Sequence, residues 1–215
     1  MGPIAVIGGT GHHGFGLAAR WAQAGRRVIV GSREETKAVE AAGRIHALIH
    51  GGDVTGAGNQ EAAAAAEVVV LTIPFAAQGE ILPAIASAVE GKIVVDTTVP
   101  LRRGAPPQIE PVAAGSAAEA AQARLPDARV VAAFHTLSAT LLANPDQPLE
   151  GDTLLCGNDP EAKRLVADLA GALGVRALDA GPLAQAAALE RLAALIIGLN
   201  KRYGRKAIGV RFTGV

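Results

Sequence analysis

The sequence has little of several things that would mark other classes of protein. Cys156 is the single cysteine among 215 residues, which excludes a disulfide framework within the chain and a cysteine-based metal site. Aromatic residues make up 3%, too few for the stacking surfaces that bind single-stranded nucleic acid. Twenty basic and twenty acidic residues cancel, which argues against a general nucleic-acid or membrane-surface binder. We expect Cys156 to be an inert thiol in a buried strand.

The start of the sequence predicts no leader segment, and long apolar runs are also missing. The chain runs from Met1 directly into an apolar strand pattern, with no charged region before it. No uninterrupted apolar run reaches the ~18 residues that a membrane span needs. Hydrophobic residues still make up 50%, against 19% charged, which predicts a sizeable core of Ala, Val, Leu and Ile. We expect a cytoplasmic protein whose partners are small molecules, not nucleic acid or a membrane.

Segments with the patterns of strands and helices alternate along the chain. Apolar runs predict strands over 3–8, 27–31, 67–73, 92–97, 129–134, 152–156 and 175–179. Residues 53–58, which are interrupted by glycine, indicate a short strand or a loop. Helical spacing or Ala-rich composition predicts helices over 12–24, 34–49, 59–66, 76–89, 117–124, 161–173 and 183–199. Residues 100–116, rich in Pro, Gly and Arg, indicate an active-site or surface loop. The alternation is typical of an α/β, doubly wound, mainly parallel sheet covered on both faces.

A glycine-rich turn links the first strand to the first helix. Residues 8–14 read GGTGHHG and contain the G-x-G-x-x-G pattern at Gly9, Gly11 and Gly14. Gly9 permits a tight turn, Gly11 lets the backbone approach a pyrophosphate, and Gly14 lets the helix pack closely on the strand. The free N–H groups at the helix start then face the anion. The pattern predicts a Rossmann-type dinucleotide site; a glycine-rich turn that binds no nucleotide is the alternative.

The end of the second strand indicates which dinucleotide binds. An NAD site usually has Asp or Glu there, which accepts from the ribose 2′-hydroxyl. This strand instead ends in Ser32 and Arg33, with Lys37 one helical turn further on. A guanidinium can bind a 2′-phosphate through two parallel hydrogen bonds, and Ser32 and Thr10 can donate others. The sequence therefore predicts NADP rather than NAD.

Two pairs of histidines need an interpretation. His12 and His13 are adjacent at a helix start, so their side chains point in different directions and are poorly placed to share a metal ion. We expect one of them to lie over the cofactor and the other to pack or face solvent. His46 and His50 are spaced i, i+4 on the second helix, but no Cys or carboxylate completes a ligand set, which favours a surface pair. We predict no metal site.

The order of the motifs resembles a known family. Residues 4–11, 30–33 (VGSR), 71–74 (LTIP) and 178–183 (LDAGPL) are similar to the NADPH-dependent reductases of coenzyme F420, a deazaflavin, and the likeness spans essentially the whole chain. The resemblance implies reversible hydride transfer between the nicotinamide C4 of NADP(H) and the deazaflavin C5. It also implies a Rossmann domain over residues 1–181 and a small helical C-terminal part, 182–215, which closes the substrate cleft.

The sequence motifs and the family resemblance together predict which residues form the cofactor site. The cofactor-binding candidates are Gly9, Thr10, Gly11, His12, His13, Gly14, Ser32, Arg33, Lys37, Ile73, Pro74, Val99 and Ala139. The resemblance implies that His135 and Leu137 lie near the nicotinamide and deazaflavin rings and orient them, without acting as an obligatory acid or base. His135 is the one polar candidate at a strand end facing the cleft, and a purely structural histidine is the alternative.

Hydride transfer places few chemical requirements on the side chains of the site. Direct hydride transfer needs close, stacked rings and exclusion of water, and the sequence shows neither a nucleophile arrangement nor paired carboxylates. Phe75 and Ser138 depart from the family pattern near the reactive centre, so other acceptors stay open. One alternative is an NADPH-dependent flavin/ferric-type or small-carbonyl reductase on the same scaffold. Another is a non-catalytic NADP-binding redox sensor.

The end of the chain is one-sided in charge. No acidic residue follows Glu190, but six basic ones do: Arg191, Lys201, Arg202, Arg205, Lys206 and Arg211. This local positive field favours an anionic ligand such as the phosphate and glutamate carboxylates of coenzyme F420; acids of the main domain or of a dimer mate are the alternative partners. The helix over 183–199 has more apolar residues than one contact surface needs, which suggests a homodimer interface.

Overall fold

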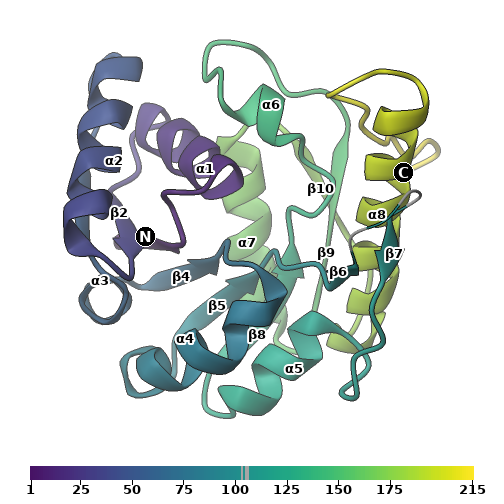
Figure 1. Cartoon of the computed structure of the whole chain (residues 1–215), viewed down its shortest axis with the longest axis horizontal. Coiled ribbons are helices and arrows are strands. Elements are labelled where there is room, and N and C mark those ends of the chain that lie inside the picture. The colour runs from purple at the N-terminus through teal and green to yellow at the C-terminus, as the bar shows by residue number, and fades with distance from the viewer. Residues whose placement is uncertain (103, 105–106) are drawn as a thin grey trace.

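One eight-stranded sheet organises the molecule (Figure 1). The computed structural model describes residues 1–102, 104 and 107–215. The strand order across the sheet is β10-β9-β8-β5-β4-β1-β2-β3. The bounds are β1 (Ile4–Ile7), β2 (Val28–Ser32), β3 (Val54–Gly58), β4 (Val68–Leu71), β5 (Ile93–Asp96), β8 (Arg129–Ala133), β9 (Asp152–Gly157) and β10 (Arg176–Asp179). Neighbours pair in parallel, except that β9 runs antiparallel to β8.

Helices cover both faces of this sheet, and two hydrophobic clusters separate accordingly. One cluster joins the sheet to α1 (His12–Gln23), α2 (Glu35–Leu48), α6 (Ala139–Leu142) and α7 (Pro160–Ala172). The other joins it to α3 (Asn59–Ala65), α4 (Gln78–Ile85), α5 (Ala117–Arg124) and α8 (Ala186–Arg202). Every residue of β1, β4 and β5 is buried, as expected of strands covered on both sides. The doubly wound, mainly parallel fold is confirmed.

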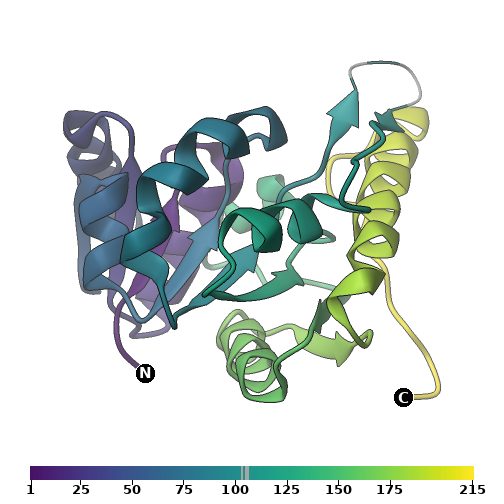
Figure 2. The ribbon, with the colours of Figure 1, turned by 90° about the horizontal axis from the view of Figure 1, so that it is seen from below.

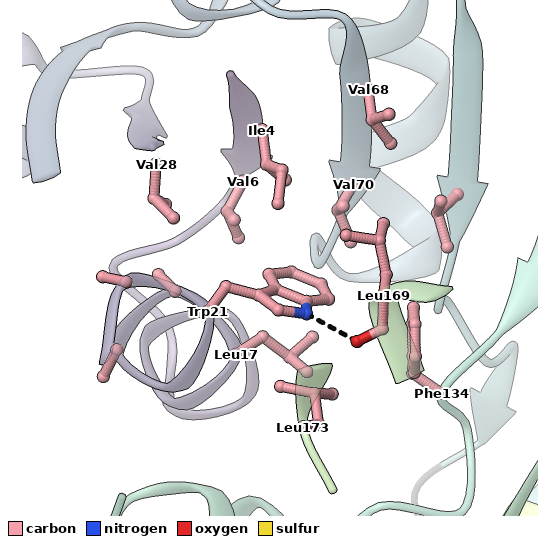
Figure 3. Packing of buried hydrophobic residues seen from close by; sticks show 14 of the residues in the cluster. Ile4, Val6, Leu17, Trp21, Val28, Val68, Val70, Phe134, Leu169 and Leu173 are labelled. Carbon is pink, nitrogen blue, oxygen red and sulfur yellow. Dashed lines mark hydrogen bonds between the residues drawn. The ribbon is translucent and has the colours of Figure 1, made fainter. Parts of the chain in front are cut away.

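A single tryptophan anchors the first cluster (Figure 3). Trp21 on α1 is fully buried, and its indole Nε1 donates a hydrogen bond to the carbonyl oxygen of Leu169 on α7 at 3.0 Å. Its ring meets that of Phe134 edge to face, with centroids 5.6 Å apart. Few aromatic side chains therefore suffice, because this one ties the first helix to elements from the second half of the chain.

The second half of the sequence holds the differences from expectation. The expected loop over 100–116 contains a short hairpin of β6 (Leu101–Arg102) and β7 (Gln108–Ile109), while its residues 103, 105 and 106 lie outside the described part. The helix expected over 76–89 is α4 flanked by 3-10 turns, Phe75–Ala77 and Ala86–Val89. Two-residue strands and one-turn helices such as α6 carry no periodic signal, so sequence patterns miss them.

The last helix forms one end of the molecule, opposite α2 and α3 (Figure 2). Its inner face, which includes Leu189 and Ala193, packs towards α5, β8 and β9, and a 3-10 turn over Leu183–Gln185 precedes it. By length and composition alone, Leu183–Arg202 is apolar enough to cross a membrane. Because its inner face is packed against the rest of the protein, the apolar composition of α8 is that of a core helix.

Candidate functional site

A cavity of about 500 Å³ opens at the carboxyl ends of the parallel strands. Residues at the ends of β1, β2 and β4 and at the starts of α1, α2, α3 and α4 surround it: Gly8, Thr10, Gly11, His12, His13, Ser32, Arg33, Glu34, Lys37, Asn59, Thr72, Ile73, Pro74, Ala77 and Ile81. This edge is where open α/β sheets bind ligands. Nine of the nominated residues are in that list, so distant motifs of the sequence do meet.

The start of α1 has no side-chain cap within the described part of the chain. The helix begins at His12 after Gly11, whose φ of −78° and ψ of 159° are extended. No side chain in the described structure caps the helix, and its first turn has no acidic residue. The first N–H groups therefore keep their hydrogen-bonding capacity and the positive end of the helix dipole for a ligand.

The three motif glycines serve different purposes. A Cβ on Gly14 would lie 2.3 Å from Thr72 Oγ1, and one on Gly9 would lie 2.8 Å from the carbonyl oxygen of Val6. These two glycines are buried and let the turn and helix pack against the strands. At Gly11 the nearest described atom would be 3.4 Å from an added Cβ, and this residue lines the cavity. Gly11 therefore borders open space in the cavity, whereas Gly9 and Gly14 allow close packing of the protein's own atoms.

The tip of β2 presents a hydroxyl and two cations to the same cavity. Ser32 is only 8% exposed, and its Oγ accepts a hydrogen bond from the Glu34 N–H at 3.3 Å, which leaves its own proton free to donate. Arg33 is exposed. Lys37 forms an ion pair with Glu34, with Nζ 2.6 Å from Oε1. The expected cluster is present, but the charge of Lys37 is partly neutralised.

Two histidines from opposite halves of the chain, His13 and His135, have ring nitrogens without described partners. Among the described residues, nothing forms a hydrogen bond to the buried Nε2 of His13 or to either buried ring nitrogen of His135. Burial lowers the pKa of each histidine to about 4, and the nearby charge of His13 contributes to the shift at His135. The Thr98 backbone acts in the opposite direction and raises the pKa of His135. It does not, however, meet the geometry of a hydrogen bond to either ring nitrogen. Both rings are therefore neutral at pH 7.

The turn after β8 explains how His135 reaches this position. Phe134 has a φ of 66°, the only positive φ among the described residues other than glycine. The buried Phe134 ring packs on Trp21, and its N–H donates to Thr153 Oγ1 at 3.2 Å. The next residue but one is also held, since Thr136 Oγ1 donates to the carbonyl of Asp152 at 2.9 Å. Strain of this kind persists only where the surroundings fix it, and it often occurs at functional sites.

The other nominated residues lie outside the lining of this cavity. Leu137 is 8% exposed and packs in the hydrophobic core, and Ala139 is the first residue of α6. Val99 is half-buried after β5. Ser138 caps α6 and also donates to the carbonyl of Lys206 at 2.7 Å, which links this segment to the end of the chain.

Sequence reasoning missed several lining residues at strand ends. Asn59 opens α3 directly after β3, and its buried Oδ1 has no described hydrogen-bond partner. Thr72 follows β4, and its hydroxyl donates to the carbonyl of Ile7 at 2.9 Å. Ala77 and Ile81 add an apolar wall from the start of α4. The signal that would have found them is position alone, because polar residues that follow parallel strands gather at one edge.

A buried polar network connects this edge to α8. Asp96 at the end of β5 accepts from the Thr98 N–H at 2.6 Å and from Gln78 Nε2 at 3.1 Å. Glu190 on α8 accepts from the Ala117 N–H at 2.8 Å, at the start of α5. Burial raises the pKa of Asp96 to about 6 and that of Glu190 to about 7, and the nearby Asp96 adds to the shift at Glu190.

A second cavity of about 700 Å³ lies between β7 and α8. Its walls are mainly apolar, including Ile109, Leu195 and Leu199, and three cations stand among them: Arg191, Lys201 and Arg202. Part of the basic end of the chain therefore gathers along one groove.

Taken together, the fold and the first cavity are typical of the Rossmann class of dinucleotide-binding proteins. The model of the family described as NADP oxidoreductase, coenzyme F420-dependent, matches residues 3–100. The F420-dependent NADP reductase of Methanocaldococcus jannaschii is 38% identical, over 99% of this chain and 98% of its own. That of Methanothermobacter marburgensis is 40% identical with the same coverage. A crystal structure described as an F420-dependent NADP reductase candidate from Arthrobacter sp. FB24 superposes with a TM-score of 0.84, at 30% identity over 98% of each chain.

The chain belongs to the family of F420-dependent NADP reductases. The resemblance seen in the sequence motifs is confirmed, and an NADP-linked oxidoreductase is the class of enzyme that this membership defines.

Proposed function

We propose that this protein transfers a hydride reversibly between NADP(H) and coenzyme F420. The observation that carries the proposal is the pairing of an open helix start with Ser32 and Arg33 at the tip of β2, where an NAD site would have a carboxylate. When bound, the two coenzymes supply the chemistry: a hydride passes between nicotinamide C4 and deazaflavin C5, with one proton exchanged with solvent. The residues of the chain bind the two coenzymes, orient their rings and exclude water from the site.

The adenosine half of NADP(H) lies along the first cavity in this proposal. Gly11 and the N–H groups that start α1 hold the pyrophosphate, with Gly9 and Gly14 shaping the turn behind them. Arg33, Ser32 and Thr10 bind the 2′-phosphate, and Lys37 adds charge from the first turn of α2. Ile73 and Pro74 pack beside the cofactor after β4.

The nicotinamide half reaches the strand ends near the two neutral histidines. His12 and His13 belong to the cofactor site, and His135 and Leu137 orient the two rings. Val99 and Ala139 complete the apolar surroundings from β5 and α6. Stacked rings at the right distance are the main catalytic contribution of such a site, so no side chain need act as a general acid.

The C-terminal part, residues 182–215, closes the substrate cleft of the Rossmann domain, residues 1–181. The groove between β7 and α8 takes the acidic phosphate and glutamate tail of coenzyme F420, because Arg191, Lys201 and Arg202 line it. We expect Arg202→Ala to raise the KM for coenzyme F420 severalfold and to leave the dissociation constant of NADPH unchanged. An unchanged KM would mean that the tail of coenzyme F420 does not bind in this groove.

The protein also forms a homodimer in this proposal and works in the cytoplasm, apart from membranes and nucleic acid. Support for the dimer comes from α8, where Leu195 and Ile197 are 58% and 43% exposed. Sedimentation equilibrium should give twice the chain mass, and Ile197→Glu should give monomers. Leu48→Glu, at a residue that is 38% exposed on α2, is the control and should remain dimeric. A wild-type monomer at micromolar concentration would exclude the dimer.

One assay tests the reaction. Purified protein and NADPH are mixed separately with coenzyme F420, FMN, FAD and a small aldehyde, and the loss of absorbance near ~340 nm is followed. We expect oxidation of NADPH with coenzyme F420 and much slower or no oxidation with the others. Turnover with a flavin or the aldehyde would assign the protein to a different acceptor. Tight NADPH binding without any turnover would indicate a sensor.

A further inference from the structure

One polar side chain in the wall of the nucleotide cavity has no partner among the described residues. Asn59 is the first residue of α3, directly after β3, and it lines the cavity. Its Oδ1 is buried, and no donor in the described structure forms a hydrogen bond to it. Its Nδ2 likewise has no described hydrogen bond, but this atom is not closed off from solvent. Native proteins satisfy most of their polar groups, so an amide left over in a cavity wall points to a ligand.

The strand register places Asn59 beside the tip of β2. The strands β2 and β3 pair in parallel, with Ser32 opposite Gly58. Arg33 and Asn59 are therefore the next residues of the two segments. The side chain of Asn59 leans towards β2, because its Oδ1 would lie only 3.1 Å from a Cβ added to Gly31. Asn59 thus belongs to the same part of the cavity wall as the hydroxyl and the guanidinium that bind the 2′-phosphate in the proposed site.

The backbone around this position is held firmly. A Cβ on Gly56 would lie 2.3 Å from the carbonyl carbon of Ala38, so α2 packs directly on the backbone of β3. The elements β2, α2 and α3 also lie together at one end of the molecule (Figure 1). The ends of β2 and β3 and the first turn of α2, which carries Lys37, therefore keep fixed positions relative to one another.

The two ends of an asparagine amide differ in chemistry, and this difference selects the ligand group. The oxygen can only accept hydrogen bonds, and the NH2 group can only donate them. The structure buries the oxygen, so the NH2 group of Asn59 is the end offered to a ligand. The opposite orientation would leave two buried donors without partners in place of one acceptor. A phosphate complements an NH2 group well, because its charged oxygens are strong acceptors.

We propose that Asn59 is a specificity-determining residue, whose Nδ2 donates a hydrogen bond to the 2′-phosphate of NADP(H). The inference rests on the proposed NADP(H) site and adds a donor from β3 to Ser32 and Arg33 from β2. The bond to a phosphate is charge-assisted, whereas a bond to the ribose 2′-hydroxyl of NAD(H) would be neutral and weaker. Asn59 therefore favours the phosphorylated cofactor without adding a positive charge to the cavity.

The test compares two ligands that differ only in this phosphate, in the absence of any acceptor. Calorimetry gives the dissociation constants of NADP+ and NAD+. We expect Asn59→Ala to raise that of NADP+ about tenfold or more, the effect of one lost hydrogen bond to a charged group, and to change that of NAD+ less than about twofold.

Asn59→Asp should weaken NADP+ further than Asn59→Ala does, because a carboxylate repels the phosphate. Gln60→Glu is the matched control. It adds the same charge at the next residue, which is exposed and is not part of the cavity wall, and it should nearly keep the wild-type ratio of the two constants.

A second measurement separates this role from a structural one. Asn59→Ala removes a buried oxygen without a partner, so the ligand-free variant should melt no lower than the wild type. A lower melting temperature with equal weakening of NADP+ and NAD+ would make Asn59 a structural residue and overturn the inference.

The remaining outcomes distinguish the inference from the proposed function. A wild type that prefers NADP+ by a ratio that Asn59→Ala leaves unchanged would overturn the inference alone. A wild type that binds NAD+ as tightly as NADP+ would reject the proposed NADP(H) site, and the inference with it. Loss of the preference in Asn59→Ala without turnover of coenzyme F420 by the wild type would support the inference and reject the proposed acceptor.

Discussion

Gly11 and Gly14 belong to one motif but respond to substitution differently. We expect Gly11→Ala to fold normally, since its φ of −78° suits alanine and the new Cβ has 3.4 Å of space. Gly11 lines the cavity, so we expect the methyl group to keep the backbone from the pyrophosphate and to raise the dissociation constant of NADPH by about tenfold or more. Fluorescence titration and urea unfolding measure the two effects.

Gly14→Ala is the matched comparison for that prediction. Its Cβ would lie 2.3 Å from Thr72 Oγ1 and 2.9 Å from the Gly9 Cα, so it should lose stability by about 1–3 kcal/mol as an overpacked site. Gly43→Ala in α2, where no described atom lies within 4 Å of a new Cβ, should be neutral or slightly stabilising. If Gly11→Ala bound NADPH as tightly as the wild type does, the pyrophosphate would not bind at Gly11.

Arg33 decides between the two dinucleotides. Its removal in Arg33→Ala should weaken NADPH by roughly 1.5–3 kcal/mol, the range for a lost charged hydrogen bond, and leave NADH nearly unaffected. Arg33→Lys should recover only part of the loss, because an ammonium lacks the planar two-pronged geometry of the guanidinium. Binding titrations with both cofactors measure the difference. Equal losses for NADPH and NADH would mean that Arg33 does not contact the 2′-phosphate.

At the scale of elements, the contact between α8 and α5 depends on a carboxyl group. Glu190 is 1% exposed, and its pKa of about 7 in the folded state exceeds its usual 4.5. The folded protein therefore binds this proton more tightly than the unfolded chain, so stability is full below about pH 4.5 and declines as pH rises to about 7. Asp96, with a pKa of about 6 against 3.8, acts in the same direction.

Glu190→Gln should remove most of that decline. The amide oxygen still accepts from the N–H groups of Ala117 and Ala118, but no charge has to be buried at high pH. Above pH 7 the variant should be more stable than the wild type by roughly 1–3 kcal/mol, at about 1.4 kcal/mol for each unit of pKa shift. Urea unfolding between pH 5 and 8 tests this, and the same slope in both proteins would show that Glu190 is ionised without penalty.

At the scale of the molecule, sequence patterns predicted the parts that local chemistry determines. Seven of the eight strands of the sheet were expected from apolar runs, and β3, which glycine interrupts, was expected as a strand or a loop. The glycine-rich turn and the Ser32–Arg33 tip were recognisable because each is a short motif of neighbouring residues. The antiparallel direction of β9 and the hydrogen bond from Ser138 to the Lys206 carbonyl were not, because both depend on how distant segments pack together. The sequence contains the residues of such contacts but no short-range signal of their proximity.

The end of the chain illustrates a long-range contact with a measurable consequence. Asp152 at the start of β9 accepts from Arg176 Nε at 2.9 Å and Nη2 at 2.8 Å, and from the Phe212 N–H at 2.6 Å. Arg176 Nη1 also donates to the carbonyl of Val215 at 2.7 Å. The hydrogen bonds from Arg176 and Phe212 lower the pKa of Asp152 to about 2. The charged carboxylate thus fastens residues 209–215 to the edge of the sheet.

Loss of this carboxylate should free the tail while the rest of the sheet stays folded. Asp152→Asn keeps the size of the side chain but loses the paired hydrogen bonds to Arg176, so amides over 208–215 should exchange faster with deuterium. Asp168→Asn, at an exposed residue of α7, is the control and should leave them unchanged. In the wild type, the stabilising effect of Asp152 is present above about pH 4 and is lost as pH falls towards 2, because its folded pKa is depressed. Equal exchange of the tail in all three proteins would show that Asp152 does not hold it, and the tail would then have to be fastened by backbone contacts such as the Asp152 N–H to the Val210 carbonyl.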